Sequence, residues 1–591
     1  MTQPACRRKR EWRLTRSPPV LTRARARPPH RGCCAGRLPK PTPQVRSNGV
    51  LPLRIGVDVG GTNTDAVLMR GREVVAWTKQ PTSADVGTGV ASAISQILGE
   101  AQARPGDIRA VMIGTTQFTN ALVERDRLDH VGVLRLASPS GDALPPLTGW
   151  PEALVDRIGG PIFLLPGGYE VDGREMAPFD ADRVRAAAAE LRARNVRAVA
   201  ISSAFAPLNP AMEERAAAIV REEVPGAAIS LSHQVGHLGF VERENAAILN
   251  AALSTLARHV VAAFERVIAD LGITASLYIS QNDGTLISAK QAAAYPVMTI
   301  GSGPTNSMRG AAFLTGTMDA IVLDVGGTTT DIGVLAGGFP RESSVAVDIG
   351  GVRTNFRMPD ILAIGLGGGT RVHLDAGLHT DGGIARDALR LGPDSVAFRI
   401  TEEAWLFGGS TLTTSDVAVA GGRAAFGDPQ RLSALSHRVI DAVLAEGDRM
   451  IEDGVDRMKT ARGEVVVLAV GGGAFLVPDT LRGATRVIRP PYAAVANAVG
   501  AAIAQVGGQV EQIVNYEVEP REQALARLRR EAEHRVVLSG GAPARAAIVD
   551  VEETFLSYLP GRSAQVRVRA AGDLELAGAE PASSEKQHSY A

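Results

Sequence analysis

The sequence carries the same eight-residue pattern twice, first near residue 60 and again near residue 326. The first copy reads Asp-Val-Gly-Gly-Thr-Asn-Thr-Asp over residues 58–65, and the second reads Asp-Val-Gly-Gly-Thr-Thr-Thr-Asp over residues 324–331. Only the sixth position differs. An apolar run rich in β-branched residues precedes each copy and another apolar run follows it. This pattern predicts a strand, a tight turn and a returning strand in both places.

The chemistry of such a turn is phosphate binding. Paired glycines have no Cβ, so their N–H groups can approach an anion closely, and successive N–H groups form a concave anion site. Threonine hydroxyls add further donors. A single copy is more simply explained as a structural turn, whereas two copies favour a phosphate clamp. The predicted phosphate-binding residues are Gly60, Gly61, Thr62, Asn63, Gly326, Gly327, Thr328 and Thr329.

The acid that opens each copy is predicted to hold Mg²⁺. Asp58 and Asp324 stand at strand ends, where a carboxylate can bind the ion directly or through water. Both are candidate catalytic and metal-binding residues, and Asp324 has the alternative role of orienting the nucleophilic oxygen or a water. Asp65 and Asp331 close the two copies. They can equally accept hydrogen bonds from turn N–H groups or take part in catalysis.

Other polar residues give weaker signals. His233 and His237 are four residues apart and, with Glu242, could form a metal site, but a solvated loop before a helix is the favoured interpretation. Ser280 and Ser302 have no histidine nearby in the sequence, so nucleophilic serine chemistry has no support.

The net charge of the chain is zero, but its charges are unevenly distributed. Residues 1–50 hold 13 Lys and Arg against a single acid, Glu11, whereas the rest carries a net charge of −12. A body this acidic is not expected to bind nucleic acid nonspecifically. The first 50 residues lack any apolar period, so they are expected to be disordered. They fit a transit peptide or an RNA-binding arm, and a mis-assigned start is the favoured explanation.

All three cysteines lie in this extension, so the body contains none. Disulfides, thiolate nucleophiles and cysteine–zinc sites are therefore excluded there, and a reducing cytoplasm is expected. An uncharged run over residues 490–510 is long enough to raise the question of a membrane span. Because it contains Asn497, Gln505 and Gln509, a buried helix is the favoured interpretation.

Alternating apolar patterns predict an α/β protein with two duplicated lobes and a small α+β segment at the end. A three-strand meander is expected over residues 54–79, and one long helix over residues 243–271 is expected to join the lobes. Strand-then-glycine patterns occupy residues 361–370 and 465–475. A helix is expected over residues 492–506. The last segment is expected to contain a charged helix over 520–533 and strands near 534–538 and 546–557.

These patterns give the expected division of the chain. The expected segments are a disordered extension (1–50), a first lobe (51–242), a second lobe (243–515), a small C-terminal α+β segment (516–573) and a disordered tail (574–591).

At the level of the whole pattern, the chain resembles the actin-like ATPase superfamily, which has a ribonuclease H-like fold. In those proteins each of two duplicated lobes contributes one phosphate hairpin, and a glycine-rich turn of the second lobe holds adenosine. The run Gly471-Gly472-Gly473 follows a predicted buried strand and precedes a helix. The resemblance therefore implies ATP as the cofactor and places its adenosine at Gly471, Gly472 and Gly473.

Within that superfamily, the chain resembles the hydantoinase/oxoprolinase family, A-type subunit (N-methylhydantoinase A-like), over residues 54–510. Gly114-Thr115-Thr116 followed by residues 119–125 is similar to the family pattern GTT…TNALLER, and residues 364–370 are similar to IGAGGGS. Residues 280–284, 302–304 and 413–416 are similar to further motifs, in family order. The chain departs from the family at Asp283 and at Thr305-Asn306-Ser307, where the family has glycine or Ala-Gly-Gly.

The resemblance implies an ATP-dependent hydrolase subunit that phosphorylates the carbonyl of a cyclic amide such as hydantoin, 5-oxoproline or a related lactam. Related carboxylases act on ketones, and a nucleotide-driven switch or a small-molecule kinase are further alternatives. A B-type partner subunit, an oligomeric assembly and a cytoplasmic location away from membranes and nucleic acids are expected. The implied substrate-facing residues are Thr115, Thr116, Asn120, Asn282 and Ser302.

Overall fold

The structure is a computed structural model that describes residues 51–575, apart from residues 84, 344–346, 357, 375–388, 558 and 560. The chain divides into two units, Met1–Gly49 and Val50–Ala591, and every described residue belongs to the second. The expectations for residues 1–50 and for the tail beyond residue 575 lie outside the described residues.

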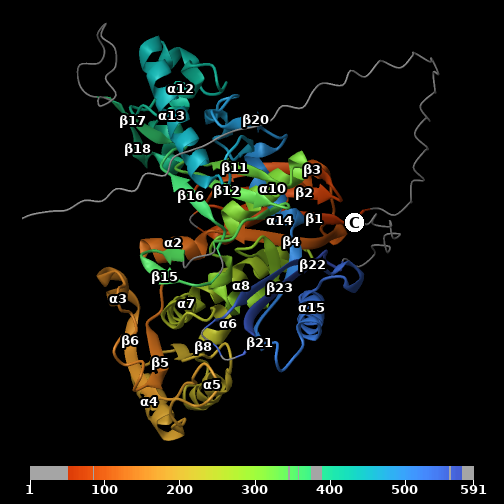
Figure 1. Ribbon diagram of the computed structural model, residues 1–591. Coiled ribbons are helices and arrows are strands. Elements are labelled where there is room, and N and C mark those ends of the chain that lie inside the picture. Colours follow the sequence, from red (N-terminus) through yellow and green to blue (C-terminus); the bar gives the residue numbers. More distant parts are fainter. Residues whose placement is uncertain are drawn as a thin grey trace, which may run out of the picture. The chain divides into compact units, whose positions relative to one another are not determined.

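The first repeated pattern forms the predicted meander (Figure 1). Strands β1 (Leu53–Val59), β2 (Asn63–Arg70) and β3 (Glu73–Pro81) are antiparallel, and Asp58 lies opposite Asp65. β4 (Ile108–Thr115) runs parallel to β1 and places Gly114 beside Asp58. Helix α1 (Val86–Ala101) packs on β2 and β3. Its first turn is capped by Asp85, whose side chain accepts the N–H of Thr88.

The second pattern repeats this arrangement in another sheet. β11 (Ala320–Val325) and β12 (Thr330–Ala336) are antiparallel, with Asp324 opposite Asp331, and β19 (Val465–Val470) runs parallel to β11. The sheet order is β13-β12-β11-β19-β20, with β16 also paired to β12. Its remaining strands are β13 (Phe339–Pro340), β16 (Ile361–Ile364) and β20 (Ala484–Ile488).

Two helices cross between the two sheets at very close range. α10 (Ser302–Thr315) packs on β11 and β12, and α14 (Ala496–Ile503) packs on β1 and β2. A Cβ at Gly310 would lie 1.9 Å from the carbonyl oxygen of Ala496, and one at Gly500 would lie 1.8 Å from that of Asn306. Glycine is therefore needed at both positions, and it allows the two helices to join the lobes as a tightly packed pair.

A smaller four-stranded sheet, in the order β6-β5-β7-β8, is inserted after β4 and carries its own core. It lies at the lower left of Figure 1 with its helices around it. Its elements, with the short helix that precedes it, are α2 (Gln117–Glu124), β5 (Val131–Ser138), α3 (Glu152–Ile158), β6 (Gly159–Pro166), α4 (Ala181–Ala193), β7 (Ala198–Ser203), α5 (Ala211–Glu223) and β8 (Ala228–Leu231).

The long helix expected over residues 243–271 is two helices, α7 (Phe240–Ala252) and α8 (Ser254–Asp270), bent by 52°. The break has a tertiary cause: the carboxylate of Asp129 accepts hydrogen bonds from Ser254 Oγ (3.1 Å) and from the N–H of Thr255 (2.9 Å), and so caps the start of α8. Within the described part of the chain, no single helix is long and apolar enough to cross a membrane; this bent pair would pass by length and composition only.

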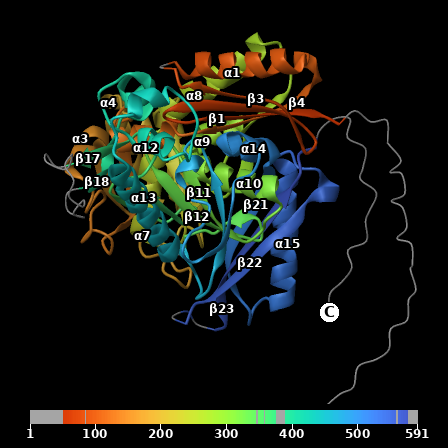
Figure 2. The same ribbon diagram turned by 90° about the horizontal axis from the view of Figure 1, so that it is seen from above.

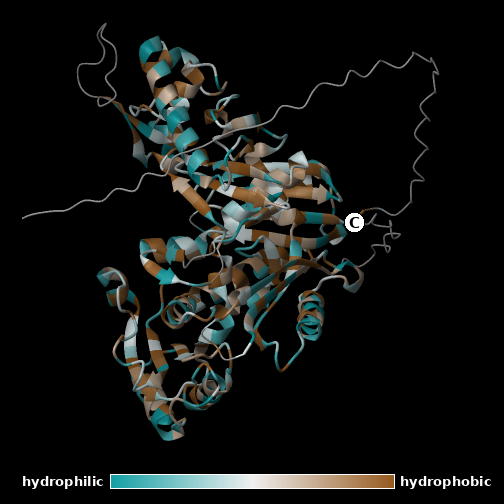
Figure 3. Cartoon of the chain, in the orientation of Figure 1, coloured by the Kyte–Doolittle hydropathy of each residue, from teal (hydrophilic) through white to brown (hydrophobic). Residues whose placement is uncertain are grey.

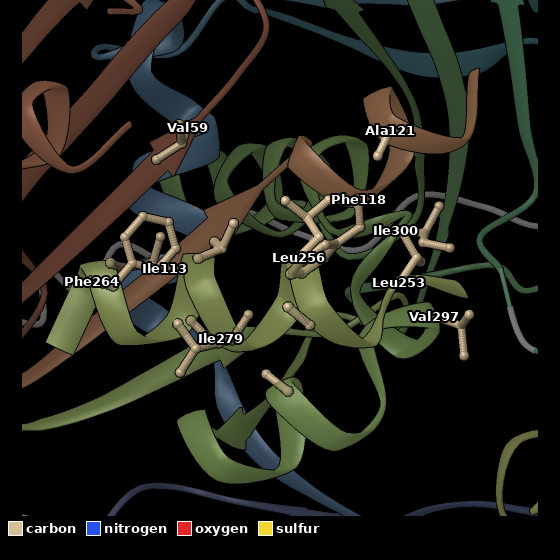
Figure 4. Close-up of a cluster of buried hydrophobic side chains, with 14 of the residues drawn as sticks. Val59, Ile113, Phe118, Ala121, Leu253, Leu256, Phe264, Ile279, Val297 and Ile300 are labelled. Carbon is tan, nitrogen blue, oxygen red and sulfur yellow. The ribbon is translucent and has the colours of Figure 1, made fainter. Parts of the chain in front are cut away.

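The core of the first lobe lies between its sheet and these helices. Figure 4 shows Phe264 and Leu256 of α8 packed near Ile113 of β4 and Ile279 of β9 (Ser276–Ser280), with Phe118 beside them. All are buried. Figure 2 shows α1 along the outer face of the same sheet.

The end of the described chain returns to the first sheet. β21 (Gln505–Asn515), β22 (Ala547–Phe555) and β23 (Ser563–Gly572) complete a nine-stranded sheet with the order β22-β23-β21-β10-β9-β4-β1-β2-β3. α15 (Arg521–Leu538) covers β21 and β23, and Figure 3 shows hydrophilic residues along it, in contrast to the hydrophobic central strands. β9 (Ser276–Ser280) and β10 (Thr285–Ser288) lie in the middle of this sheet.

Two expectations for this end of the chain are wrong, and two strands had not been expected. The strand near 534–538 is the last turn of α15, because Leu528, Ala532 and Val536 continue its helical spacing on the buried face. The helix expected over 492–506 ends at Ile503, and β21 and β23 had not been expected as strands. The remaining described elements are α6 (Ser232–Val235), α9 (Ala289–Ala294), β14 (Val347–Ile349), β15 (Val352–Thr354), β17 (Thr370–Leu374), β18 (Leu389–Ser395), α11 (Ile400–Glu403), α12 (Thr414–Ala420) and α13 (His437–Met458).

The sheets also cross the expected segment boundaries. β9 and β10, which follow residue 243, pair in the first sheet, as do the strands after residue 505. A first lobe limited to residues 51–242 and a separate segment 516–573 therefore do not match the strand pairing. The division of the chain into segments remains a proposal, and here the two lobes are defined by their sheets.

Candidate functional site

The two repeated turns have the same geometry and face one another. The N–H of Gly60 donates to Asn63 O, and the N–H of Gly326 donates to Thr329 O, each at 2.9 Å. A methyl group placed on Gly327 would lie 3.8 Å from Cγ2 of Thr62. The turns of the two lobes thus lie close together, and their role as a phosphate clamp remains a prediction.

Both turns present backbone donors toward this junction. In the described residues, no hydrogen bond uses the N–H groups of the central turn residues Gly61, Thr62, Gly327 and Thr328. Glycine in each turn leaves these groups without a covering Cβ. Two such sets of N–H groups suit a polyphosphate chain.

Asp58 is buried at the end of β1 and held by two amides. Asn497 Nδ2 donates to one carboxylate oxygen at 3.0 Å, and Asn306 Nδ2 lies 3.4 Å from the other. A Cβ at Gly114 would lie 2.4 Å from Asp58 Oδ1, so glycine is needed beside the carboxylate. Burial, followed by the negative charge of Asp65, raises the pKa of Asp58 to about 7.

Asp324 occupies the matching position in the second lobe. Burial raises its pKa, and a hydrogen bond from Ser307 partly offsets that shift. Gly471 has a φ of +88°, and its Cβ would lie 2.5 Å from Asp324 Oδ1. The N–H of Gly473 donates to Val325 O at 2.8 Å. The Gly471–Gly473 run therefore packs directly against the second turn, and its role in adenosine binding remains a prediction.

Of the acids that close the two patterns, Asp65 is buried and Asp331 is half-buried. Asp65 accepts hydrogen bonds from Lys79 (2.7 and 2.8 Å) and from Asn497 (2.8 Å), whereas no turn N–H group in the described chain donates to it. Burial, with Asp324 nearby, raises the pKa of Asp331 to about 7. Of the two interpretations left open for Asp65, the structure therefore does not support turn stabilisation.

The junction is rich in negative charge. Asp58 and Asp324 influence each other electrostatically, each has a neighbouring acid, and burial raises the pKa of all four carboxyls. A divalent cation would lower these pKa values, so the donor set fits Mg²⁺ with phosphate oxygens. Within the described residues no cluster of three or more His, Cys, Asp or Glu forms a ready metal site. A cation held by Asp58 and Asp324 would therefore need phosphate oxygens or water as further ligands.

Lys79 is a residue of this site that the sequence analysis missed. It lies at the edge of the first lobe, and its Nζ bonds both Asp65 oxygens and the carbonyl oxygen of Ala494 at 3.2 Å. A Cβ at Gly472 would lie 3.3 Å from Lys79 Cε. The side chain thus touches both the first hairpin and the glycine turn of the second lobe. A signal was available, because the β2–β3 register places Lys79 opposite Asp65.

A further glycine loop, residues 365–369, packs against the second turn. The N–H groups of Gly368 and Gly369 donate to Gly326 O (3.0 Å) and Gly327 O (2.7 Å). Thr414 Oγ1 in turn donates to Gly368 O at 3.0 Å. The strand-then-glycine pattern predicted this loop but not its position, and the structure shows that the loop packs against the backbone of the turn.

Three of the predicted substrate residues lie beside the first turn. Thr115 is buried at the end of β4, and the N–H of Thr116 donates to Val59 O at 3.1 Å. Asn120 Nδ2 would lie 3.7 Å from a Cβ on Gly61. The strand pairing of β1 and β4 brings these residues together.

The other two predicted substrate residues differ. Ser302 begins α10 and is buried, and its hydroxyl makes no hydrogen bond in the described chain. Asn282 is held by backbone: Nδ2 donates to Val297 O at 2.9 Å, and Oδ1 accepts the N–H of Gly301 at 2.7 Å. Asn282 therefore positions the start of α10, and contact with a substrate at the turns remains a prediction.

A large cavity of about 940 Å³ lies apart from the turns, and no residue of either hairpin lines it. His233 and His237 do line it. Glu242 pairs with Arg353 at 3.3 Å, so the three residues do not form the metal site considered from their spacing. The favoured alternative, a solvated loop, is also wrong for His233, whose side chain is only 14% exposed.

Comparison with known proteins finds chains related to this one. The description "Hydantoinase/oxoprolinase N-terminal region" matches residues 54–224, and "Hydantoinase/oxoprolinase" matches residues 243–428. Together the two matches cover more than half of the chain.

One curated relative and two solved structures are similar over long stretches. Caprolactamase subunit alpha of Pseudomonas jessenii is 29% identical over 397 residues, 63% of this chain and 55% of the relative, so the chain spans about half of that relative's length. The crystal structure of the ATP-dependent caprolactamase from the same organism has a TM-score of 0.69 at 21% identity, covering 88% of each chain. Nucleotide-free acetone carboxylase has a TM-score of 0.64 at 18% identity, covering 91% and 90%.

These likenesses concern the fold. With the paired hairpins, they confirm the predicted α/β architecture with two duplicated lobes.

Proposed function

We propose that this chain, which belongs to the hydantoinase/oxoprolinase family, uses ATP to activate the carbonyl of a cyclic amide for ring opening. The pair of Gly-Gly-Thr turns carries the proposal, one from each lobe and each following an aspartate whose pKa is raised by burial. ATP would supply the phosphoryl group that converts an unreactive amide carbonyl into a good electrophile. Such a transfer depends chiefly on positioning and on charge neutralisation.

The residues take the following roles. The N–H groups of the two turns bind the phosphates from both sides, and the run Gly471–Gly473 backs the adenosine. Asp58 and Asp324 hold Mg²⁺ between the lobes. Lys79, which bonds Asp65 in the structure, adds a positive charge near the phosphates. Thr115, Thr116 and Asn120, beside the first turn, together with Ser302, orient the substrate carbonyl.

The substrate is proposed to be a lactam, hydantoin or 5-oxoproline, because one curated relative is a caprolactamase subunit. Ketone carboxylation is the second candidate, and it is favoured by the fold likeness to acetone carboxylase. Both reactions begin with phosphorylation of a carbonyl or enol oxygen, so the site described here would serve either.

We also propose a partner subunit of the B type, since the caprolactamase relative is itself named as a subunit. An oligomeric assembly and a cytoplasmic location follow the same expectation. The location agrees with the absence of cysteine from residues 51–591.

The deciding experiment is an ATPase assay on the purified chain, alone and with a B-type subunit, against hydantoin, 5-oxoproline, caprolactam, acetone and acetophenone. Stimulation by a cyclic amide, with ring-opened product, is the expected result. Stimulation by ketones and bicarbonate alone would select the carboxylase. An ATPase rate that no compound changes would contradict both and favour a nucleotide-driven switch.

A further inference from the structure

His233 and His237 sit in a cavity that the proposed nucleotide site does not use. The cavity is bounded by the α6 region, the β9–β10 turn and the middle of β21. At about 940 Å³ it lies within the range of small-molecule sites. Pro210 and Phe356 add apolar surface, and both histidines line it together with Arg535 and Arg569.

His233 is held in place by a fully buried carboxylate. Its Nδ1 lies 2.7 Å from Oε2 of Glu213, which is 0% exposed. The same carboxylate also accepts the N–H of Ser203 (2.8 Å), the hydroxyl of Ser232 (2.5 Å) and the N–H of His233 itself (3.2 Å). Burying a carboxylate is unfavourable unless its oxygens accept hydrogen bonds. Here four donors bond the Glu213 carboxylate, and this arrangement fixes the imidazole of His233.

The segment that carries both histidines is rigid for a second reason. Arg243 of α7 is fully buried, and it donates to Ser232 Oγ and to the carbonyl oxygens of His237 and Leu238, each at 2.9 Å. The N–H of His237 donates to Asn355 at 3.2 Å. The ring of His237 pairs with a second carboxylate: its Nδ1 lies 2.9 Å from Oε2 of Glu511. Both rings are therefore pre-positioned by a supporting shell.

These contacts determine which hydrogen bonds the rings can still make. An ionised carboxylate only accepts, so Nδ1 of each neutral ring carries the proton and Nε2 is left as an acceptor. With both rings neutral, the cavity contains two imidazole acceptors. Arg535 and Arg569 also line it; Arg535 pairs with Glu531 and Arg569 with Glu342, and their remaining N–H groups can donate. A compound with both an N–H and a carbonyl oxygen on a small apolar ring matches this combination.

We propose that this cavity binds a small cyclic amide, with its N–H accepted by Nε2 of His233 or His237. The inference rests on the proposed function only in taking the substrate to be an amide. It assigns cyclic amides a second binding site, apart from the residues beside the first turn that are proposed to orient the reacting carbonyl.

The cavity lies on the same edge of the first sheet as the first turn. Strands β1, β4 and β9 are parallel, so Val59, Thr115 and Ser280 end together, and β9 is two strands from β1, about 10 Å at the usual strand spacing. Asn282 lines the cavity, and its carbonyl oxygen accepts Thr305 Oγ1 at 2.9 Å. The next residue of α10, Asn306, contacts Asp58. Thr305 and Asn306 of α10 therefore connect the cavity wall to the first Gly-Gly-Thr turn.

The test measures binding of two matched rings, 2-pyrrolidinone and its N-methyl derivative, to the full chain without nucleotide by calorimetry. His233→Phe and His237→Phe keep a ring but remove the acceptor. His373→Phe is the control, since His373 forms a similar pair with Asp394 (2.7 Å) but does not line the cavity. Thermal unfolding and Mg-ATP binding show whether each variant is folded.

We expect 2-pyrrolidinone to bind at least tenfold more tightly than the N-methyl compound, and one of the two cavity variants to abolish that difference. The control should keep it. Equal binding of the two rings, or a preference that both folded cavity variants retain, would overturn the inference, as would a cavity that binds Zn²⁺ through both histidines instead. If the amide binds in a histidine-dependent way but does not stimulate ATP turnover, the proposed function is contradicted and the cavity site is supported.

Discussion

At the scale of single residues, the site is an arrangement of buried acids around one lysine. Burial raises the pKa of Asp58, Asp65 and Asp324, and the charge of Lys79 partly offsets each shift. Isolated buried carboxylates are unfavourable, so this part of the molecule is expected to gain much from a bound cation. Function and stability are therefore coupled at the same side chains.

Replacing Lys79 by Met should reduce kcat of the amide-stimulated ATPase about 100-fold, because a positive charge near the phosphates is lost. Part of the effect should appear as lower stability, since Asp65 loses its ion pair. Lys290→Met is the control, because Lys290 is exposed on α9. A K79M enzyme with the wild-type kcat would show that the lysine serves the fold alone.

The raised pKa of Asp331 predicts how the stability of the protein depends on pH. Its folded pKa is about 7, above the value of about 3.9 expected in an unfolded chain. The folded state therefore binds more protons between these values, and this group's contribution to stability is lost as pH rises from about 4 to about 7. Without nucleotide or metal, Asp331→Asn should gain Tm relative to wild type as pH rises from 5 to 8. A difference in Tm that stays constant with pH would contradict this.

At the scale of elements, tight glycine contacts hold the turns in register. The Gly471–Gly473 turn and the loop of residues 365–369 pack against the second turn from two sides. The crossing of α10 and α14 depends on Gly310 and Gly500 in the same way. Side chains at these positions would displace backbone, which a packed interior resists.

Gly471→Ala should lower stability by about 2–5 kcal/mol, combining a positive φ with a clash against Asp324. It should also weaken ATP binding. Gly463→Ala is the matched control: its φ is +133° but nothing lies within 4 Å of the added methyl group. Denaturant unfolding and nucleotide titration of both variants would measure the two effects. Equal losses in the two variants would rule out a specific role for the 471 turn.

At the scale of the whole molecule, the function requires both lobes at once. Each supplies one turn and the aspartate that precedes it, and the lobes meet because α10 and α14 join the two sheets. A ligand that bridges the turns should therefore stabilise the whole described body rather than one lobe.

Mg-ATP at a hundred times its Kd should stabilise the wild-type chain by about 2.7 kcal/mol. The double variant Asp58→Asn with Asp324→Asn should lose this stabilisation and at least about 100-fold in ATP hydrolysis. Asp156→Asn with Asp270→Asn makes the same change of net charge at exposed positions and should behave as wild type. Normal ATP hydrolysis by the first double variant would refute the metal assignment.

The sequence by itself determined the local chemistry of this protein. The Gly-Gly-Thr turns, the aspartates before them and the predicted strands around them follow from residue type and period 2 alternation, which are local properties. The duplication then indicated two lobes. Residue types also placed Thr115 and Thr116 at a strand end.

Only the tertiary structure decided how distant segments meet. Asp129 breaks the helix at Leu253, β21 and β23 return to the first sheet, and Lys79 reaches the second lobe. His233 is held by Glu213, and its neighbour Ser232 by Arg243, both of which come from other elements. Such contacts join residues far apart in the chain, and no local pattern encodes which pairs will touch.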